Sequence, residues 1–329
     1  MAVIADDRDV AEQALAEYAL APGSALSLLN LSENATYLVQ DAGTGERSIL
    51  RVHRQGYHRP HEIASELDWL TALRADSDVA VPVVLEARDG RRIVDVEHHG
   101  TTRHVVHFAL VPGTEPDESN LRTTDFETLG RITAALHEHS RSWGRPAGFG
   151  RFAWDWDHSL GTQPRWGRWQ HATGVGASER GVLSRAEELL QHRLTAYGAD
   201  PSRFGLVHAD LRPANLLVDG PSITVIDFDD CGFGWFFYDF GTAVSFIEDD
   251  PHLGEWQEAW IAGYRSRAPI TRADVDMLAS FVMMRRLLLL AWMGTHSHST
   301  ESQTKAAGFA EGSCALAERY LSSEGRSLL

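Results

Sequence analysis

Cysteine and long apolar runs are both scarce in this 329-residue sequence. Its two cysteines, Cys231 and Cys314, are too few for a disulfide framework or a cysteine zinc site. The N-terminus has early acidic residues and lacks the apolar segment of a signal peptide. The most apolar stretch, FVMMRRLLLLAWM, is interrupted by Arg285 and Arg286 and is too short to span a bilayer. We therefore expect a cytoplasmic protein with no membrane partner.

Positive charge is limited, and lysine is almost absent. The formal net charge is −16 at pH 7, and Lys305 is the single lysine among 30 basic residues. This balance argues against nucleic acid as a partner, because phosphate backbones are met by basic surfaces. It suits a cationic small molecule, or solubility alone. The sequence leaves both a monomer and a homodimer open.

Several nucleotide and metal motifs are missing as well. The sequence contains neither a Walker-A motif nor GxGxxG, so P-loop and dinucleotide-binding readings have no basis. Sixteen histidines include close pairs such as His137 and His139, but there is no HExxH or Cys/His ligand set. Surface or core positions explain these histidines adequately.

The secondary-structure pattern predicts an α+β fold. Residues 1–111 hold a short helix at 7–20, several alternating β segments, and a helix over 61–75 with apolar residues at helical spacing. Pro112-Gly113 breaks this pattern. Residues 112–329 are mostly helical, with three further helices expected from about position 236 to 323. We therefore expect a sheet-rich N-terminal lobe and a mostly helical C-terminal lobe.

Polar residues concentrate on two loops that follow apolar strands. The first loop, HADLRPAN at 208–215, places Asp210 and Asn215 five positions apart. The next strand, ITVI, ends at Asp227-Phe228-Asp229. Kinase catalytic loops have the same Asp-to-Asn spacing, followed by a strand and an Asp-Phe pair. Turn chemistry explains one such loop, but two loops in this order indicate a phosphoryl-transfer site.

With these motifs the chain resembles the superfamily of aminoglycoside phosphotransferases and choline kinases. Its texture is most similar to the homoserine-kinase-like and stress-kinase-like bacterial branches. The resemblance covers roughly residues 25–300. It implies a protein-kinase-like bilobal fold, in which residues 1–111 bind the nucleotide and residues 112–329 carry the catalytic and acceptor-binding groups.

The resemblance also implies the cofactors ATP and Mg²⁺ and a set of residue roles. Asp210 would accept the proton of the acceptor hydroxyl. Asn215 and Asp227 would bind Mg²⁺, which prefers oxygen ligands. His208 would orient the catalytic loop, and Asp239 would brace that loop from the following helix.

The phosphate-binding lysine of such kinases has no counterpart in residues 1–111. Arg51, in the strand SILRVHR, occupies the matching position and can donate two hydrogen bonds to phosphate oxygens. A surface strand position would also fit its alternating pattern. Glu66 is the expected helix partner of Arg51, and Glu62 is the alternative.

Two other segments should contact the nucleotide. The turn between the first two strands, with Ser32 and Asn34, should cover the phosphates through side chains and backbone amides. Main-chain groups from Ala109 to Val111 should meet the adenine.

The sequence departs from the family loop at two positions. Ala209 replaces a glycine, and Arg212 replaces a second histidine. Arg212 is a third candidate catalytic residue, a cation near the acceptor site for contact with phosphate or an acidic substrate. Asp229 and Asp230 are the acceptor-site candidates closest to the chemistry. The tryptophans of segment 152–170 are expected to pack the helical lobe, although aromatic faces with carboxylates can also hold an amine. For Arg285 and Arg286 we expect a buried structural ion pair.

These observations favour an ATP- and magnesium-dependent kinase for a hydroxyl of a small molecule. An amine-bearing antibiotic and an amino alcohol such as homoserine or choline are the acceptors considered. A stress-kinase-type protein Ser/Thr kinase is disfavoured, because only a few residues separate the second acidic loop from the next helix. A nucleotide-binding pseudokinase, marked by Arg51, is the non-enzymatic alternative. The choice between ATP and GTP stays open.

Overall fold

The computed structural model describes residues 2–31, 34–296 and 300–329. The chain forms two compact units, each built from three segments. Unit 1 comprises Met1–Thr114, Gly144–Arg151 and Leu217–Asp229. Unit 2 comprises Glu115–Trp143, Phe152–Leu216 and Asp230–Leu329. A single boundary after residue 111 stays a prediction, since two later segments also group with the N-terminal region.

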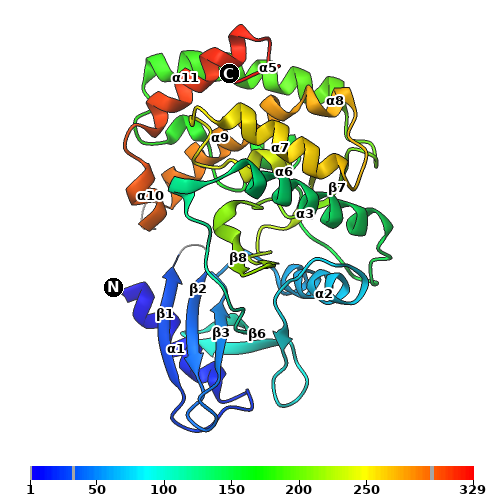
Figure 1. Cartoon of the computed structure of the whole chain (residues 1–329). Coiled ribbons are helices and arrows are strands. Elements are labelled where there is room, and N and C mark those ends of the chain that lie inside the picture. The colour runs from blue at the N-terminus through cyan, green and yellow to red at the C-terminus, as the bar shows by residue number, and fades with distance from the viewer. Residues whose placement is uncertain (1, 32–33, 297–299) are drawn as a thin grey trace. The chain divides into compact units, whose positions relative to one another are not determined.

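Unit 1 is organised around an antiparallel sheet with the strand order β1-β2-β3-β6-β4, in which β5 also pairs with β6 (Figure 1). Its strands are β1 (Ala25–Leu31), β2 (Ala35–Gln40), β3 (Arg47–Val52), β4 (Val84–Leu85), β5 (Ile93–His98) and β6 (Thr101–Ala109). A separate two-stranded hairpin is formed by β8 (Leu216–Asp219) and β9 (Ser222–Val225). The hairpin ends at Val225, two positions before the predicted metal ligand Asp227.

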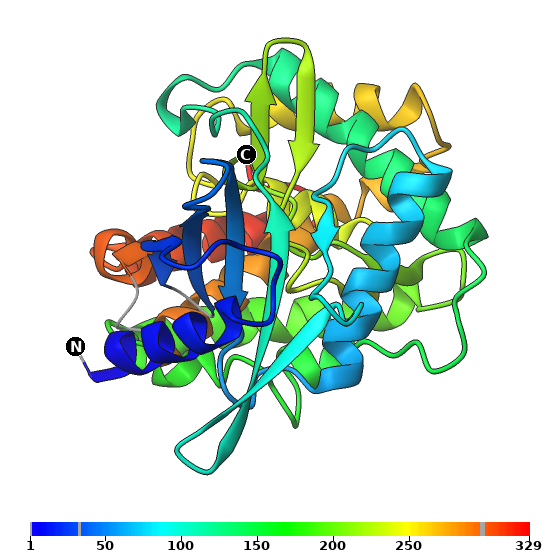
Figure 2. The ribbon, with the colours of Figure 1, turned by 90° about the horizontal axis from the view of Figure 1, so that it is seen from below.

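Helix α1 (Ala2–Leu15) covers one face of this sheet. Strand alternation places Tyr37 and Val39 of β2 in the core at 1% and 0% exposure, and Val10 and Ala14 of α1 pack into the same cluster at 0%. Figure 2 shows α1 beside the sheet and β5 and β6 as a long hairpin. The sequence predicted this helix over 7–20, whereas it spans Ala2–Leu15 and so begins and ends earlier in the chain.

Helix α2 (Pro60–Asp76) closely matches the predicted helix over 61–75. Pro60 occupies the first turn, where its missing N–H costs nothing. The Glu62 carboxylate accepts the Arg59 N–H at 2.8 Å and caps the helix start. Ile63 and Leu67, two of the periodic apolar residues, are fully buried. The helical period thus aims one face of α2 into unit 1.

Unit 2 is mostly helical. Its helices are α3 (Thr123–Ser142), α4 (Trp156–Ser159), α5 (Ala177–Tyr197), α6 (Tyr238–Ala243), α7 (Leu253–Arg265), α8 (Arg272–Val275), α9 (Leu278–Thr295), α10 (Thr300–Lys305) and α11 (Phe309–Ser322). Short 3₁₀ turns lie at Glu118–Asn120, Trp169–His171 and Pro213–Asn215, and β7 (Phe204–Val207) pairs with β10 (Gly232–Trp235). Among the described residues, six helices follow position 236 where three were predicted, because α6, α8 and α10 are too short to show a clear period.

Helices α3 and α7 lie side by side in unit 2 (Figure 1). A Cβ atom on Gly130 would lie 2.1 Å from the carbonyl oxygen of Trp260, and one on Gly263 would lie 1.9 Å from that of Glu127. The two helices can approach this closely because both contact positions are glycine.

Helix α9 is the buried centre of unit 2 and contacts α5, α6 and α11. Among the described residues, the stretch Arg272–Thr295 has the length and composition of a membrane span, but 94% of its most apolar window is buried inside the protein. Burial of this kind is typical of the core helix of a soluble protein.

Candidate active site

Asp239 of α6 holds the loop that follows β7, residues 208–215. The Asp239 carboxylate accepts the backbone N–H groups of Ala209 at 2.7 Å and His208 at 3.2 Å. Ala209 has a φ of +65°, in the left-handed region that costs an L-residue about 1 kcal/mol. The glycine of the family pattern suits this backbone, and here the hydrogen bonds to Asp239 hold an alanine in it.

His137 of α3 supports Asp239 in turn, and sequence reasoning missed this role. Its Nε2 atom lies 3.0 Å from Asp239 Oδ2, and its Nδ1 atom lies 3.1 Å from the Tyr264 hydroxyl. Burial lowers the pKa of His137 although Asp239 opposes this effect. The neutral ring therefore accepts from Tyr264 and donates to Asp239. No local pattern joins these residues, since 102 positions separate His137 from Asp239.

Asp210 lies on this braced loop with both carboxylate oxygens engaged. Asn215 Nδ2 donates to Asp210 Oδ2 at 2.6 Å and to its backbone carbonyl at 2.8 Å. A guanidinium nitrogen of Arg285 donates to the other carboxylate oxygen. Arg212 Nε is 3.6 Å from Oδ2, beyond a direct hydrogen bond. The side chain of Asp210 is 15% exposed, so the carboxylate is oriented and still reachable.

His208 and Asn215 also take positions that fit their predicted roles. His208 is fully buried, and its Nδ1 atom lies 3.3 Å from the Asp210 backbone nitrogen. Asn215 spends its amide nitrogen on Asp210, so its amide oxygen is the atom available for a metal. These two roles stay predictions, supported by the geometry of unit 2.

In unit 1, Arg51 pairs with Glu66 as predicted. One terminal guanidinium nitrogen donates to both carboxylate oxygens, at 2.7 and 2.8 Å, and the two residues are 7% and 0% exposed. Glu62, the alternative partner, caps α2 instead. The phosphate-binding role of Arg51 stays a prediction.

Asp229 is buried in unit 1 at 5% exposure and faces three basic side chains. Its carboxylate oxygens lie 3.0 Å from His58 Nε2, 3.6 Å from His53 Nδ1 and 3.9 Å from a terminal nitrogen of Arg51. Burial alone would raise the pKa of Asp229, but the electrostatic effects of His58, Arg51 and His53 hold it well below its usual range. An acceptor-binding role for Asp229 stays a prediction, and these contacts give it no support.

The remaining predicted positions are more dispersed. Asp227 is exposed, with a φ of +61°. Asn34 is buried at 7% and its side-chain oxygen accepts the Arg54 N–H at 3.0 Å, whereas Ser32 lies outside the described residues. Ala109 N–H donates to the Val83 carbonyl, and Val111 is half-buried. The nucleotide-binding roles of these positions stay predictions.

Asp230 belongs to unit 2 and is half-buried. Its carbonyl accepts the indole N–H of Trp154 at 2.8 Å, and Trp154 packs edge-on against Trp166. Trp154, Trp166 and Trp169 are 0–3% exposed, in agreement with the expected packing role, whereas Trp156 is half-buried. The acidic residue Asp155 of the same segment caps α4.

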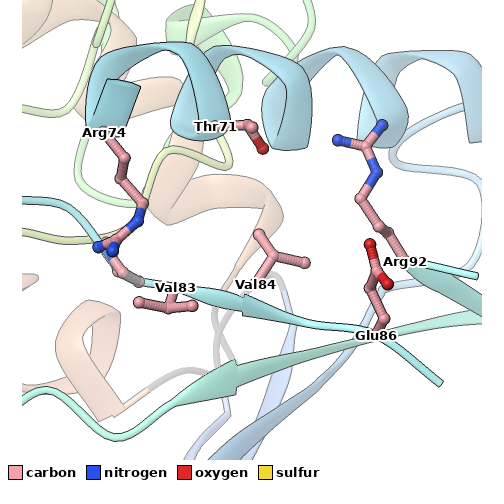
Figure 3. A pocket seen from close by; sticks show the side chains of 7 residues that line it. Thr71, Arg74, Val83, Val84, Glu86 and Arg92 are labelled. Atoms are coloured by element: carbon pink, nitrogen blue, oxygen red, sulfur yellow. The ribbon is translucent and has the colours of Figure 1, made fainter. Parts of the chain in front are cut away.

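A pocket of unit 1 lies between α2 and the β4 segment. Thr71 and Arg74 extend into it from α2, and Glu86 and Arg92 lie across from them (Figure 3). Arg92 is paired with Asp68 at 2.6 Å. None of the predicted catalytic or nucleotide-binding residues lines this pocket.

Residues 27–275 match the model of the phosphotransferase enzyme family, which includes the aminoglycoside phosphotransferases. The chain belongs to this family. The match includes both acidic loops, so the predicted family is confirmed.

Two curated relatives are similar over most of their length. An amicoumacin kinase of Bacillus subtilis (strain 168) is 25% identical over 291 residues, which cover 84% of this chain and 83% of that protein. An uncharacterized protein of Deinococcus radiodurans is 30% identical over 293 residues, which cover 87% and 82%.

Solved structures give both a near relative and the fold. A microcompartment-associated aminopropanol kinase is 66% identical, with a TM-score of 0.91 and coverage of 98% of this chain and 100% of that one. An amicoumacin kinase in complex with AMP-PNP and Ca²⁺ is 20% identical, with a TM-score of 0.77 and coverage of 94% and 93%. A spectinomycin phosphotransferase in complex with ADP is 12% identical, with a TM-score of 0.64 and coverage of 95% and 98%. The predicted α+β, protein-kinase-like fold is confirmed, and this member of the family is a small-molecule kinase.

Proposed function

We propose that this protein transfers the γ-phosphoryl group of ATP, with Mg²⁺, to the hydroxyl of a short amino alcohol, with aminopropanol as the first candidate. The observation that carries the choice of acceptor is the 66% identity to an aminopropanol kinase over nearly the whole chain. The net charge of −16 suits a cationic acceptor. We also propose a cytoplasmic protein without a membrane partner, and the burial of Arg272–Thr295 inside the protein argues against a membrane span there.

Asp210 would accept the hydroxyl proton. As the acceptor oxygen bonds to the γ-phosphorus, the bond from that phosphorus to the β,γ-bridging oxygen breaks and ADP leaves. The O–H proton passes to the Asp210 carboxylate, so charge and atoms balance. Asn215 donates to one carboxylate oxygen of Asp210 and Arg285 donates to the other. Each oxygen therefore keeps a lone pair that can accept the hydroxyl proton.

Asn215 and Asp227 would hold the metal. The residues fit this role, because the amide oxygen of Asn215 and the exposed carboxylate of Asp227 are hard oxygen donors of the kind Mg²⁺ takes. When bound, the nucleotide would supply the phosphoryl group and the metal would offset the negative charge of its phosphates. Arg51, kept in place by Glu66, would contact the phosphate oxygens.

Antibiotic phosphorylation is the second candidate, favoured by the similarity to an amicoumacin kinase. At 25% identity this relative supports the reaction type better than the acceptor. An acceptor panel separates the two.

The test is ADP release by purified protein with Mg-ATP against both enantiomers of 1-amino-2-propanol, ethanolamine, choline, homoserine, amicoumacin and spectinomycin. 1,2-Propanediol is the matched acceptor without an amine. We expect turnover with aminopropanol, weak or no turnover with the diol, and loss of turnover in Asp210→Asn. Turnover only with an antibiotic contradicts the proposed acceptor. ATP binding with no turnover on any acceptor contradicts the kinase itself.

A further inference from the structure

Two consecutive arginines on the buried helix α9 have different carboxylate partners. Arg285 and Arg286 are each 3% exposed. Arg286 pairs with Glu248 at 2.8 Å and Asp249 at 3.1 Å, both outside the acidic loops. Arg285 pairs with Asp210, the candidate proton acceptor. The expected structural ion pair thus describes Arg286 well, whereas Arg285 contacts the centre of the reaction.

Arg285 is itself fixed by several elements of unit 2. Its Nε donates to the Ser245 hydroxyl at 2.9 Å, and a terminal nitrogen lies 3.4 Å from both the Ala209 carbonyl and the Tyr238 hydroxyl. The Trp166 ring lies 5.2 Å from the guanidinium carbon, within cation–π range. A side chain held at so many points presents its last N–H to Asp210 in a defined direction.

The two donors to Asp210 come from different elements of unit 2. Asn215, on the catalytic loop itself, bonds to Oδ2, and Arg285, 75 positions away on α9, bonds to Oδ1. One donor leaves a carboxylate free to rotate about χ2, whereas two donors on different oxygens fix its plane. Reactions that need an aligned proton acceptor lose roughly 10²-fold in rate when that acceptor shifts by about 1 Å.

We propose that Arg285 is a positioning residue that fixes the plane of the Asp210 carboxylate for the acceptor hydroxyl. This inference rests on the proposed function.

The test compares Arg285→Lys with the matched control Arg286→Lys, which keeps a charge on the same buried helix. We expect Arg285→Lys to lower kcat roughly 10²-fold, the size of a misplaced reacting group, with the KM values for ATP and aminopropanol nearly unchanged. We expect the control Arg286→Lys to keep kcat within about threefold of wild type, although its Tm falls by a similar amount. Guanidinium ion, added to Arg285→Ala, should restore part of kcat and do nothing for wild type.

Equal kcat losses in the two lysine variants, in proportion to their losses of Tm, overturn the inference. An aminopropanol KM that rises at constant kcat also overturns it and makes Arg285 an acceptor-binding residue. A double-mutant cycle of Asp210→Asn and Arg285→Lys on Tm needs no substrate. Additive shifts show that the pair is not coupled, and they overturn the inference. A wild type inactive on the whole panel contradicts the proposed function, and the cycle still decides the pairing.

Discussion

The Nε2 atom of His137 lies 3.0 Å from Oδ2 of Asp239, and both side chains are completely buried. Through this contact α3 supports α6, and α6 supports the loop that carries Asp210. A buried histidine outside the catalytic loop thus helps to set the backbone of that loop.

Asp239→Asn should reduce activity much more than a comparable change elsewhere. One carboxylate oxygen becomes an NH₂ group, which cannot accept the backbone N–H of Ala209 or His208. We expect kcat to fall about 10²-fold and the free energy of unfolding to fall by about 2 kcal/mol. Both are measured on one preparation, by ADP release and by urea unfolding.

The control for this change is Asp274→Asn. Asp274 is also a buried aspartate of unit 2, where it caps α8 and accepts from Tyr197 at 2.6 Å. Asp274→Asn should lower the free energy of unfolding by a similar amount and leave kcat unchanged. Equal kcat in both variants would show that Asp239 does not set the loop.

Arg51→Lys should be tolerated, whereas Arg51→Met should not. A single nitrogen of Arg51 makes both bonds to Glu66, so one ammonium can replace them. Methionine leaves Glu66 buried and unpaired, at a cost of about 3–5 kcal/mol. We expect a KM for ATP within about threefold of wild type for lysine and more than about tenfold higher for methionine, since a charge-assisted bond to phosphate is lost. A methionine variant with normal stability and KM refutes the role.

Much of unit 1 could be predicted from local pattern. The apolar period of α2 places Glu66 on a buried face. The alternation of β3 left a surface position open for Arg51, and the resemblance to kinases supplied the pairing with Glu66 that the structure shows. The two acidic loops were visible because the residues in each are close in sequence.

The rest depends on contacts between distant segments. Arg285 and Arg286 look alike in the sequence. Only the packing of α9 determines that Arg285 pairs with Asp210 and Arg286 with Glu248. Asp229 and Asp230 look equally available on their loop, yet Asp229 is enclosed by two histidines and Arg51. A local pattern cannot distinguish neighbours whose environments are set by residues far away in the sequence, such as Glu248, which lies 38 positions from Arg286.

Gly130→Ala should destabilise unit 2 strongly. The new Cβ would lie 2.1 Å from a backbone oxygen of α7, which cannot move without separating the two helices. Overpacking of this kind costs about 3 kcal/mol or more, although alanine raises helix propensity. Thermal unfolding measures the effect. Gly144→Ala, where a Cβ meets open space, is the control, and equal Tm values for the two variants would show that α3 and α7 have room to separate.

Stability should fall in mild acid, and His107→Gln should reduce this fall. Burial lowers the pKa of His107 to about 4, and its Nε2 atom lies 2.6 Å from the Ser48 hydroxyl. The unfolded chain titrates near pH 6.5, so between about pH 6.5 and 4 the unfolded state binds a proton that the folded state excludes. The free energy of unfolding then decreases by up to about 1.4 kcal/mol per pH unit and about 3 kcal/mol in all. His53 and His137, whose pKa values are also lowered, add to the fall.

Urea unfolding of wild type and His107→Gln from pH 4.5 to 7.5 measures this difference. At pH 7.5 His107→Gln should have a lower free energy of unfolding than wild type, because its contact with Ser48 is altered. The variant lacks the proton uptake of His107 on unfolding, so its free energy of unfolding falls less steeply with pH and the difference from wild type narrows as the pH falls. His192→Gln, at an exposed position, is the control for a histidine-to-glutamine change elsewhere in the chain. A curve for His107→Gln that runs parallel to that of wild type would show that His107 takes up its proton in the folded protein, against the low pKa that its burial produces.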